Sequence, residues 1–295
     1  MPRTQGRDVR RNFARDAVGV GLRPPHFADA FEDPSGVDFF EVIAENYTGT
    51  GPVPASNLAR ARSLRPVALH GVSLDLLGSD PIDQDHVRRV SELAANLDAP
   101  CFSDHLCWTR LDGWHSHDLL PTPFTEKIAD HAAARAEIVQ SLLPIPFGIE
   151  NLSSYAAFEG STLTEWEFYK RVVDLAKVWR MLDINNIYVS AMNHGFDPRS
   201  YLESIDWDRV LYVHLAGHHI RPDGLRIDTH DAPVCEEVWD LYRDAWTLGG
   251  PFPTLIEWDD NLPSWGRLVE EADTARLCRK VRRTLVTESV LESAA

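Results

Sequence analysis

Ionisable residues stand at the ends of short apolar runs throughout this 295-residue chain. A single His or carboxylate in such a place is ordinarily a hydrogen-bonded structural residue, because a buried charge is costly unless it is paired or ligated. Several together indicate more, since imidazole and carboxylate groups jointly bind transition metals. The residues that end these runs are His70, His105, Glu150, Asp183, His214 and Glu257. Their concurrence predicts a shared metal site.

Two further segments add candidate ligands. Asp228 and His230, in the sequence DTHD, are close enough to chelate one ion, and His194 lies in a predicted loop, NHG. Asn185 lies two residues after Asp183, so an extended strand would project both side chains from one side. This set exceeds the roughly four to six ligands that one ion takes, so we expect two or three ions bridged by carboxylates. Imidazole and carboxylate without thiolate suit iron, manganese or zinc.

Eight short apolar runs are predicted to be the strands that position these residues. Near-continuous apolar runs suit strands that are buried on both faces, as in a parallel sheet. The expected strands cover residues 18–23, 39–45, 67–72, 101–106, 147–152, 180–186, 210–216 and 253–258. Asp104 and Asn151 lie beside predicted ligands, and we expect them to hydrogen-bond ligand side chains and fix their orientation.

Segments with helical periodicity separate these strands. Val87, Val90 and Ala94 recur at helical spacing, and Thr164 with Glu167 forms a capping-box pattern. The expected helices cover 82–97, 122–143, 165–177, 233–248 and about 265–285, with shorter turns at 25–32, 55–64 and 198–205. Strand and helix alternate eight times, which predicts a single (β/α)₈ TIM barrel of the xylose-isomerase-like kind, with its active site at the carboxyl ends of the strands.

The composition of the chain and its distribution indicate the domain bounds and exclude several partners and cofactors. We expect a mobile basic extension at 1–16, a barrel at 17–286 and a tail at 287–295. No apolar run is long enough to span a bilayer and the N-terminus lacks the apolar region of a secretory signal, so we expect a cytoplasmic protein without a membrane partner. The net charge of −16 argues against a nucleic-acid partner. No cysteines form a C-x-x-C pair, and no G-x-G-x-x-G pattern follows a strand, so neither a thiolate zinc site nor an organic cofactor is expected.

Ordered motifs between about residues 18 and 270 show a family resemblance. They are LHGVSLDLLG (69–78), SDHLCW (103–108), HDLLPTP (117–123), IENLSSY (149–155), MLDINNIYVSAMNHG (181–195), VHLAGH (213–218), DTHD (228–231) and IEWDDNLPSW (256–265). With them the chain resembles the multinuclear non-heme iron-dependent oxidative enzymes, the group that contains the methanobactin and thiaglutamate peptide oxidases. The match is specific because eight motifs recur in order.

The resemblance implies a barrel with two or three iron ions, as Fe(II) and Fe(III), that uses O₂ to modify a residue, above all cysteine, of a ribosomally made precursor peptide. It also implies a separate small partner protein that binds the leader of that peptide. By motif position, the catalytic ligands form a first group of His70, His105 and Glu150 and a second group of Asp183, His214 and Glu257. A third ion would be bound by Asn185, His194, Asp228 and His230.

Other functions use the same side chains. Divalent-metal sugar isomerases and metal-dependent hydrolases or endonucleases also bind ions with His, Glu and Asp in barrels, where the metal polarises a substrate or activates water. A non-catalytic metal-binding barrel would instead have a closed ligand set with no open position. The identity of the bound metal discriminates best between the oxidative and the hydrolytic classes.

Overall fold

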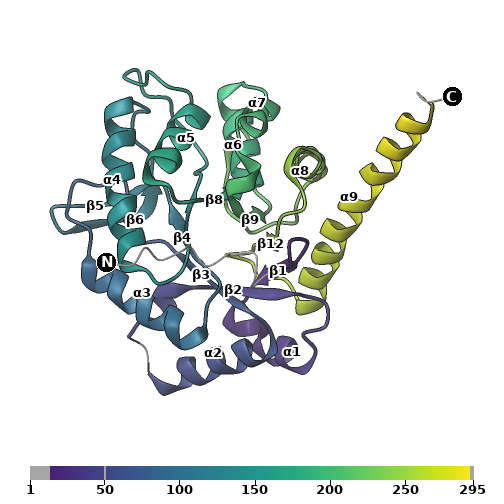
Figure 1. Ribbon diagram of the computed structural model, residues 1–295, viewed down its shortest axis with the longest axis horizontal. Coiled ribbons are helices and arrows are strands. Elements are labelled where there is room, and N and C mark those ends of the chain that lie inside the picture. Colours follow the sequence, from purple (N-terminus) through teal and green to yellow (C-terminus); the bar gives the residue numbers. More distant parts are fainter. Residues whose placement is uncertain (1–13, 50, 293–295) are drawn as a thin grey trace.

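Eight parallel strands form a closed barrel in the computed structural model, which describes residues 14–49 and 51–292 (Figure 1). Around the barrel the strands follow the order β1-β12-β9-β8-β7-β4-β3-β2. Their bounds are β1 Val18–Gly21, β2 Phe39–Ile43, β3 Val67–Gly71, β4 Phe102–His105, β7 Phe147–Glu150, β8 Trp179–Asp183, β9 Val210–Leu215 and β12 Thr254–Ile256. The predicted TIM barrel is therefore confirmed.

Helices surround the barrel (Figure 1). They are α1 Phe27–Glu32, α2 Pro52–Leu64, α3 Gln84–Leu97, α4 Glu126–Leu142, α5 Glu165–Ala176, α6 Ile184–His194, α7 Pro198–Glu203, α8 Glu236–Gly249 and α9 Trp265–Glu292, with short 3₁₀ helices at η2 Pro24–His26, η3 Ala44–Asn46 and η4 Trp207–Arg209. The five longer predicted helices are all present. The capping box is also confirmed, since the Thr164 side chain accepts from the Glu167 N–H and the Glu167 side chain accepts from the Thr164 N–H.

Two hydrophobic clusters form the core, one between the strands and the helices and one inside the barrel. The larger fills the space between strands and helices. The smaller consists of Ala17, Phe39, Ala68, Cys101, Met181, Leu211, Tyr212 and Leu255. Because side chains alternate along a strand, Met181 and Asp183 lie on one face of β8, as do Tyr212 and His214 on β9. The register pairs Met181 with Tyr212 and Asp183 with His214. An apolar layer thus lies below a layer of ionisable groups.

The predicted strand at 180–186 is wrong in its second half. β8 ends at Asp183, and α6 begins at Ile184. The Asp183 side chain accepts a hydrogen bond from the Asn186 N–H at 2.6 Å, which caps the helix. Asn185 therefore lies in the first turn of α6, not on the Asp183 side of a strand, and the predicted NHG loop is the end of the same helix. Residues 184–191 are all buried, and a buried helix start cannot be told from a strand by its apolar run alone.

Two small antiparallel sheets were not predicted. The strands β5 (Trp108–Leu111) and β6 (Trp114–Leu120) follow β4 directly, and β10 (His219–Ile220) and β11 (Arg226–Ile227) follow β9. The buried Asp75 anchors the first sheet, since its Oδ1 accepts from the Thr109 N–H at 2.6 Å and the Arg110 N–H at 3.1 Å. Both sheets therefore extend from the end of the barrel at which the predicted ligands lie.

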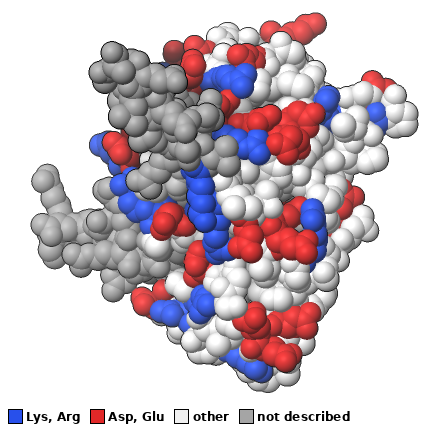
Figure 2. All heavy atoms as spheres, turned by 90° about the vertical axis from the view of Figure 1, so that its right-hand side faces the viewer, with Lys and Arg blue, Asp and Glu red and all other residues white. Residues whose placement is uncertain are grey.

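The ends of the chain bear on the expected domain bounds. Residues 1–13 of the predicted N-terminal extension and residues 293–295 of the predicted tail lie outside the described residues. Within the described part of the chain, no helix is long and apolar enough to cross a membrane. On the face shown in Figure 2, Asp and Glu side chains form several patches, with Lys and Arg side chains between them.

Candidate metal centre

Three groups of His and carboxylate side chains lie at the carboxyl ends of the barrel strands, where each group could hold a metal ion. The first contains His70, His105 and Glu150, the second contains Glu150, Asp183, His214 and Glu257, and the third contains His230, Glu257 and Asp259. In each group the candidate ligand atoms lie within 4.8 Å of one another. Glu150 and Glu257 each belong to two groups, so the three form one continuous cluster.

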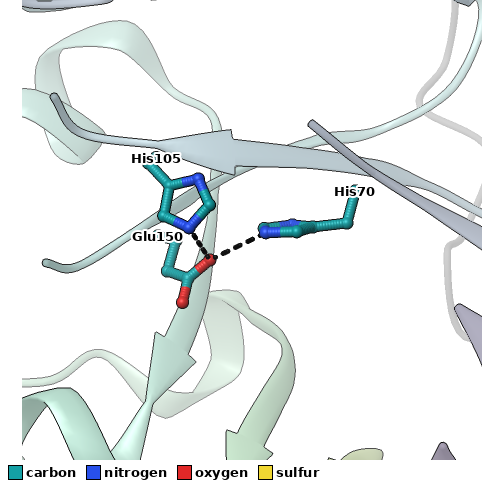
Figure 3. A group of neighbouring side chains, drawn as sticks. All are labelled: His70, His105 and Glu150. Carbon is teal, nitrogen blue, oxygen red and sulfur yellow. Dashed lines mark ion pairs between the residues drawn. The ribbon is translucent and has the colours of Figure 1, made fainter. Parts of the chain in front are cut away.

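In the first group two imidazoles face one carboxylate oxygen (Figure 3). His70 Nε2 and His105 Nε2 each lie 3.2 Å from Glu150 Oε2. The other ring nitrogens are occupied: His70 Nδ1 lies 2.8 Å from Ser103 Oγ, and His105 Nδ1 lies 3.1 Å from the Gly71 carbonyl oxygen. Both rings therefore present Nε2 to the centre.

The second group presents the opposite atom of its imidazole. His214 Nδ1 lies 2.7 Å from Glu257 Oε2 and 3.8 Å from Glu150 Oε1. Its Nε2 lies 3.1 Å from Oε1 of Glu41, a buried carboxyl group on β2. Nδ1 is thus the His214 atom that faces the second group, and three carboxyl groups surround the imidazole ring.

The third group lies on loops at the rim. His230 Nδ1 lies 3.1 Å from Asp259 Oδ2 and 3.3 Å from Glu257 Oε2, and its Nε2 lies 2.6 Å from Asp228 Oδ1. The Asp259 side chain is 42% exposed and also pairs with Arg23, whose Nη2 lies 2.6 Å from Asp259 Oδ1. This group is therefore closer to solvent than the other two.

The four residues predicted to bind a third ion are brought together only in part. Asp228 contacts His230, and the Asn185 amide donates to Asp228 Oδ1 at 2.8 Å. His194 is exposed at the end of α6, where its Nε2 lies 2.8 Å from Ser154 Oγ, and it belongs to none of the three groups among the described residues. Asp259, which was not among the predicted ligands, contributes instead. Its place two residues after Glu257 was a signal that could have identified it.

Buried atoms without hydrogen-bond partners show that these groups suit a cation. Among the described residues, Glu150 Oε1 and Oε2, Asp183 Oδ2, His214 Nδ1 and His230 Nε2 are buried without a hydrogen bond of acceptable geometry, and their short contacts are with other candidate ligands. Buried polar atoms normally have hydrogen-bond partners, so several exceptions within one cluster call for an explanation. Coordination provides one, because mixed nitrogen and oxygen donors suit a first-row transition metal.

The electrostatics lead to the same conclusion. Burial raises the pKa of Glu150 well above its usual range, and it raises the pKa of Asp183 to about 7, with Asp228 adding repulsion. Burial lowers the pKa of His70 well below its usual range, and His105 and His214 lower it further. Without a cation Glu150, Asp183 and His70 therefore resist their charged forms, so metal binding would stabilise the ionised forms of the two carboxyl groups and displace their protons.

Asp104 and Asn151 were expected to hydrogen-bond ligand side chains, but their side chains bind backbone groups instead. The Asp104 carboxylate accepts from the His105 N–H at 2.7 Å and from the Ser73 and Leu74 N–H groups at 3.2 Å. The Asn151 side chain donates to the Asp183 carbonyl oxygen and accepts from the Asp183 N–H, both at 3.0 Å. These bonds fix where ligand-bearing segments lie, while other residues fix the imidazole rings.

Comparison with known proteins places the chain among peptide-modifying enzymes. A family model described as "RiPP precursor modification enzyme MbnB/TglH/ChrH" matches residues 17–280. RiPPs are ribosomally synthesised and post-translationally modified peptides. The chain belongs to this family. Its relatives include UPF0276 proteins of Rhizorhabdus wittichii, 46% identical over 90% of this chain and 95% of the relative, and of Caulobacter vibrioides, 45% identical over 88% and 93%.

Solved structures with similar folds are TIM barrels of low sequence identity. A D-tagatose 3-epimerase-like protein superposes with a TM-score of 0.58 at 16% identity, covering 93% of this chain and 99% of that one. D-psicose 3-epimerase from Clostridium cellulolyticum gives 0.57 at 12% identity, covering 86% and 89%. A xylose isomerase-like TIM barrel protein from Mycobacterium smegmatis gives 0.56 at 10%, covering 86% and 87%. At these identities the similarity establishes the fold alone.

Proposed function

We propose that this family member is an iron-dependent oxidase that uses O₂ to modify a cysteine residue of a ribosomally made precursor peptide. The observation that carries the proposal is the cluster of buried candidate ligand atoms, several of them without a hydrogen bond, in three groups joined by Glu150 and Glu257. An enzyme that acts on peptides needs an open site, and the cluster lies at the end of the barrel where such enzymes bind substrate. The family match supplies the class of substrate.

The proposed ligands divide by group. His70, His105 and Glu150 would hold one ion, and Asp183, His214 and Glu257 would hold a second, with Glu150 between them. A third ion would be held by His230 with Asp228 and Asp259. Asn185 and His194 stay proposed contributors, of which Asn185 lies one hydrogen bond from Asp228.

Bound iron would supply redox chemistry with O₂, which takes the electrons that the peptide loses. The chain supplies the geometry of the site. Ser103, the Gly71 carbonyl and Glu41 hold the three inner imidazoles with one ring nitrogen facing the centre. The carboxylates offset the charge of the ions, and the buried surroundings keep bulk water from the inner groups.

The proposal also includes a separate small protein that binds the leader of the precursor. Barrel strands and their helices account for most of the described residues, and two small sheets, β5–β6 and β10–β11, project from the ligand end. Peptide leaders are often captured as an added strand at a sheet edge. Co-purification of the chain with products of neighbouring genes would test whether such a partner exists.

The test begins with metal content. The protein is purified under nitrogen without added metal, and iron, zinc and manganese are quantified per chain. We expect two or three irons and Mössbauer signals of both Fe(II) and Fe(III). The second step offers O₂ and the product of a short cysteine-containing reading frame beside the gene, and follows oxygen uptake and peptide mass.

Two results would contradict the proposal. One is zinc or manganese in place of iron, with iron unable to support any activity, which would favour isomerisation or hydrolysis. The other is full iron loading with no oxygen consumption beyond the peptide-free control. The same peptide with its cysteines changed to serine is the matched substrate control, and it should leave oxygen uptake at the peptide-free level.

A further inference from the structure

A continuous chain of hydrogen bonds runs beneath the metal groups and joins ligands of two of them. His70 Nδ1 lies 2.8 Å from Ser103 Oγ, which lies 2.6 Å from the Tyr212 hydroxyl. That hydroxyl lies 2.5 Å from Glu41 Oε2, and Glu41 Oε1 lies 3.1 Å from His214 Nε2. All five side chains are at most 2% exposed. The chain therefore connects the first group to the second through the interior of the barrel, shielded from water.

The carboxylate of Glu41 sets the direction of every bond in this chain. A carboxylate only accepts, so the Tyr212 hydroxyl donates to Glu41 and must accept from Ser103. Ser103 has then used its only proton, and it must accept from the Nδ1–H of His70. The lone pair of His70 is left on Nε2, which faces Glu150.

At its other end the same carboxylate accepts from the Nε2–H of His214. With an ion bound, the lone pair of His214 would therefore be on Nδ1, which lies 2.7 Å from Glu257 Oε2. One carboxylate thus fixes the tautomers of two ligands that lie on different strands and in different groups. A ligand ring in the wrong tautomer would present an N–H to the metal, which cannot bind there.

The two ends of this chain of hydrogen bonds give their imidazoles different partners. His214 has a carboxylate as its partner, whereas His70 has a hydroxyl group and His105 has a backbone carbonyl. A carboxylate partner makes an imidazole a stronger electron donor. The second group also contains three carboxylates and one His, while the first contains one carboxylate and two His. Both differences stabilise the higher positive charge in the second group.

We infer that Glu41 is a positioning residue that, through Tyr212 and Ser103, fixes the ligating atoms of His214 and His70 and makes the second group the one that favours Fe(III). The inference rests on the proposed function, because it concerns an iron centre. The first group then holds Fe(II). Glu41, Tyr212 and Ser103 contact neither substrate nor ion in this arrangement and act through the histidines.

The experiment changes one end of the chain of hydrogen bonds at a time, in the iron-loaded, full-length protein. Glu41→Gln alters the partner of His214, and Ser103→Ala alters the partner of His70. Iron per chain, Mössbauer spectra and a mediated redox titration are recorded for each. We expect Glu41→Gln to move the ferric signals and to lower the Fe(III)/Fe(II) ratio at fixed potential about tenfold, which is about 59 mV for one electron. Ser103→Ala should move the ferrous signals and leave the ferric ones.

Tyr242→Phe is the matched control for the loss of a buried polar group. Tyr242 is fully buried and its hydroxyl is hydrogen-bonded, to Thr254 and Arg279, but on α8 outside the barrel. The Tyr242→Phe substitution should leave iron content, spectra and potential unchanged.

If Glu41→Gln fails to fold or to hold iron, Tyr212→Phe tests the inference in its place, because it removes one oxygen from the middle of the chain of hydrogen bonds. That variant should perturb the ferrous signals, since Ser103 loses the partner that sets its direction.

The results separate this inference from the function on which it rests. Wild-type protein without iron would contradict the proposed function itself. An iron-loaded wild type with spectra and potential that Glu41→Gln and Tyr212→Phe leave unchanged would overturn the inference and leave the function standing. A reversed pattern, with Glu41→Gln moving only the ferrous signals, would overturn the assignment of Fe(III) to the second group and Fe(II) to the first.

Discussion

The first and third ligand groups are built in different ways, although the second group connects them. His70, His105 and Glu150 lie on the barrel strands β3, β4 and β7, whose register fixes the backbone, and their side chains are at most 10% exposed. His230 and Asp259 lie in loops after β11 and β12, and the Asp259 side chain is 42% exposed. Strands give the first group, here called the inner group, a fixed geometry. The third group, here called the outer group, depends on loops and on the ion pair between Asp259 and Arg23.

This difference predicts that the inner ion is held tightly and the outer ion loosely. Ligands on paired strands lose little freedom when they bind, because the ladder already orders them. Ligands on loops must be ordered by the ion, and loops open locally at lower free energy than core strands. The number of ions found per chain, two or three, would then depend on how well the outer group survives purification.

The largest effect is expected from Glu150→Gln. Glu150 Oε2 faces both imidazoles of the first group, and Glu150 also belongs to the second group. Loss of its charge should weaken both inner ions by about 100-fold or more, since even indirect partners of ligands contribute about 10–100-fold. Iron per chain and calorimetric titration with Fe(II) under nitrogen measure the effect.

Glu165→Gln is the matched control for this substitution. Burial raises the pKa of Glu165 to about 8, so this carboxyl group is mostly protonated at pH 7 and resembles the amide that would replace it. It lies on α5 and belongs to none of the three groups. Equal iron loss in the two variants would mean that Glu150→Gln acts through folding, and the comparison of groups would fail.

Chelation should separate the groups in time. In iron-loaded protein treated with excess chelator, the outer ion should leave at least about tenfold faster than the inner ions, which corresponds to roughly 1.4 kcal/mol in opening free energy. Stopped-flow absorbance of the chelator complex follows the release. Asp259→Asn should remove the fast phase and leave the slow one. Release of all iron in one phase from wild type would show that the groups open together.

Two glycines allow each region to be disturbed through its backbone. A Cβ at Gly71 would lie 2.5 Å from Asp104 Oδ2, whose carboxylate holds the backbone of His105, and a Cβ at Gly217 would lie 2.0 Å from the Ala232 carbonyl oxygen, beside the His230 loop. Each substitution to Ala should cost about 1–3 kcal/mol of unfolding free energy. Gly71→Ala should weaken the inner ion and Gly217→Ala the outer ion, as chelation rates and urea unfolding would show. Gly160→Ala, with nothing within 4 Å of the new Cβ, is the control.

The sequence was sufficient to predict that the residues of the first group lie together, because the signal for each of them is local. His70, His105 and Glu150 each end an apolar run, and the fold rule for parallel barrels brings strand ends together. The outer group was predicted less well, since loop conformation has no comparable rule. Asp228 and His230 lie together as expected, but the position of His194 depended on α6, whose first three residues were included in the strand predicted at 180–186.

Glu41 and Tyr212 could not be predicted, for a different reason. Each lies within an apolar run, and alternation alone suggests that Glu41 shares a strand face with Phe39 and Tyr212 with His214. Their contact joins β2 to β9, which are not neighbours in the barrel. Only the closure and register of the whole barrel bring the two side chains together, and no spacing in the sequence records these.

The smallest expected effect concerns protons, which compete with the ions differently in the two regions. Burial lowers the pKa of His230, but Asp228 and Glu257 outweigh it and raise that pKa well above its usual range. Burial, with repulsion from His105 and His214, lowers the pKa of His70 well below its usual range. In metal-free protein at pH 7 we therefore expect an imidazolium at His230 and a neutral imidazole at His70. An outer ion must displace the proton of His230, so its affinity should fall about tenfold for each pH unit below that pKa and level off above it.

Nitrogen-15 NMR of histidine-labelled, metal-free protein at pH 7 measures the two charge states directly, with His230→Asn and His70→Asn to assign the signals. Calorimetry in buffers of different ionisation enthalpy then counts the protons that each ion releases. A neutral His230 at pH 7 would remove the expected difference. The outer ion would then owe its weaker binding to loop mobility alone, and its affinity would lose the pH dependence that the His230 proton imposes, while the chelation rates would keep their order.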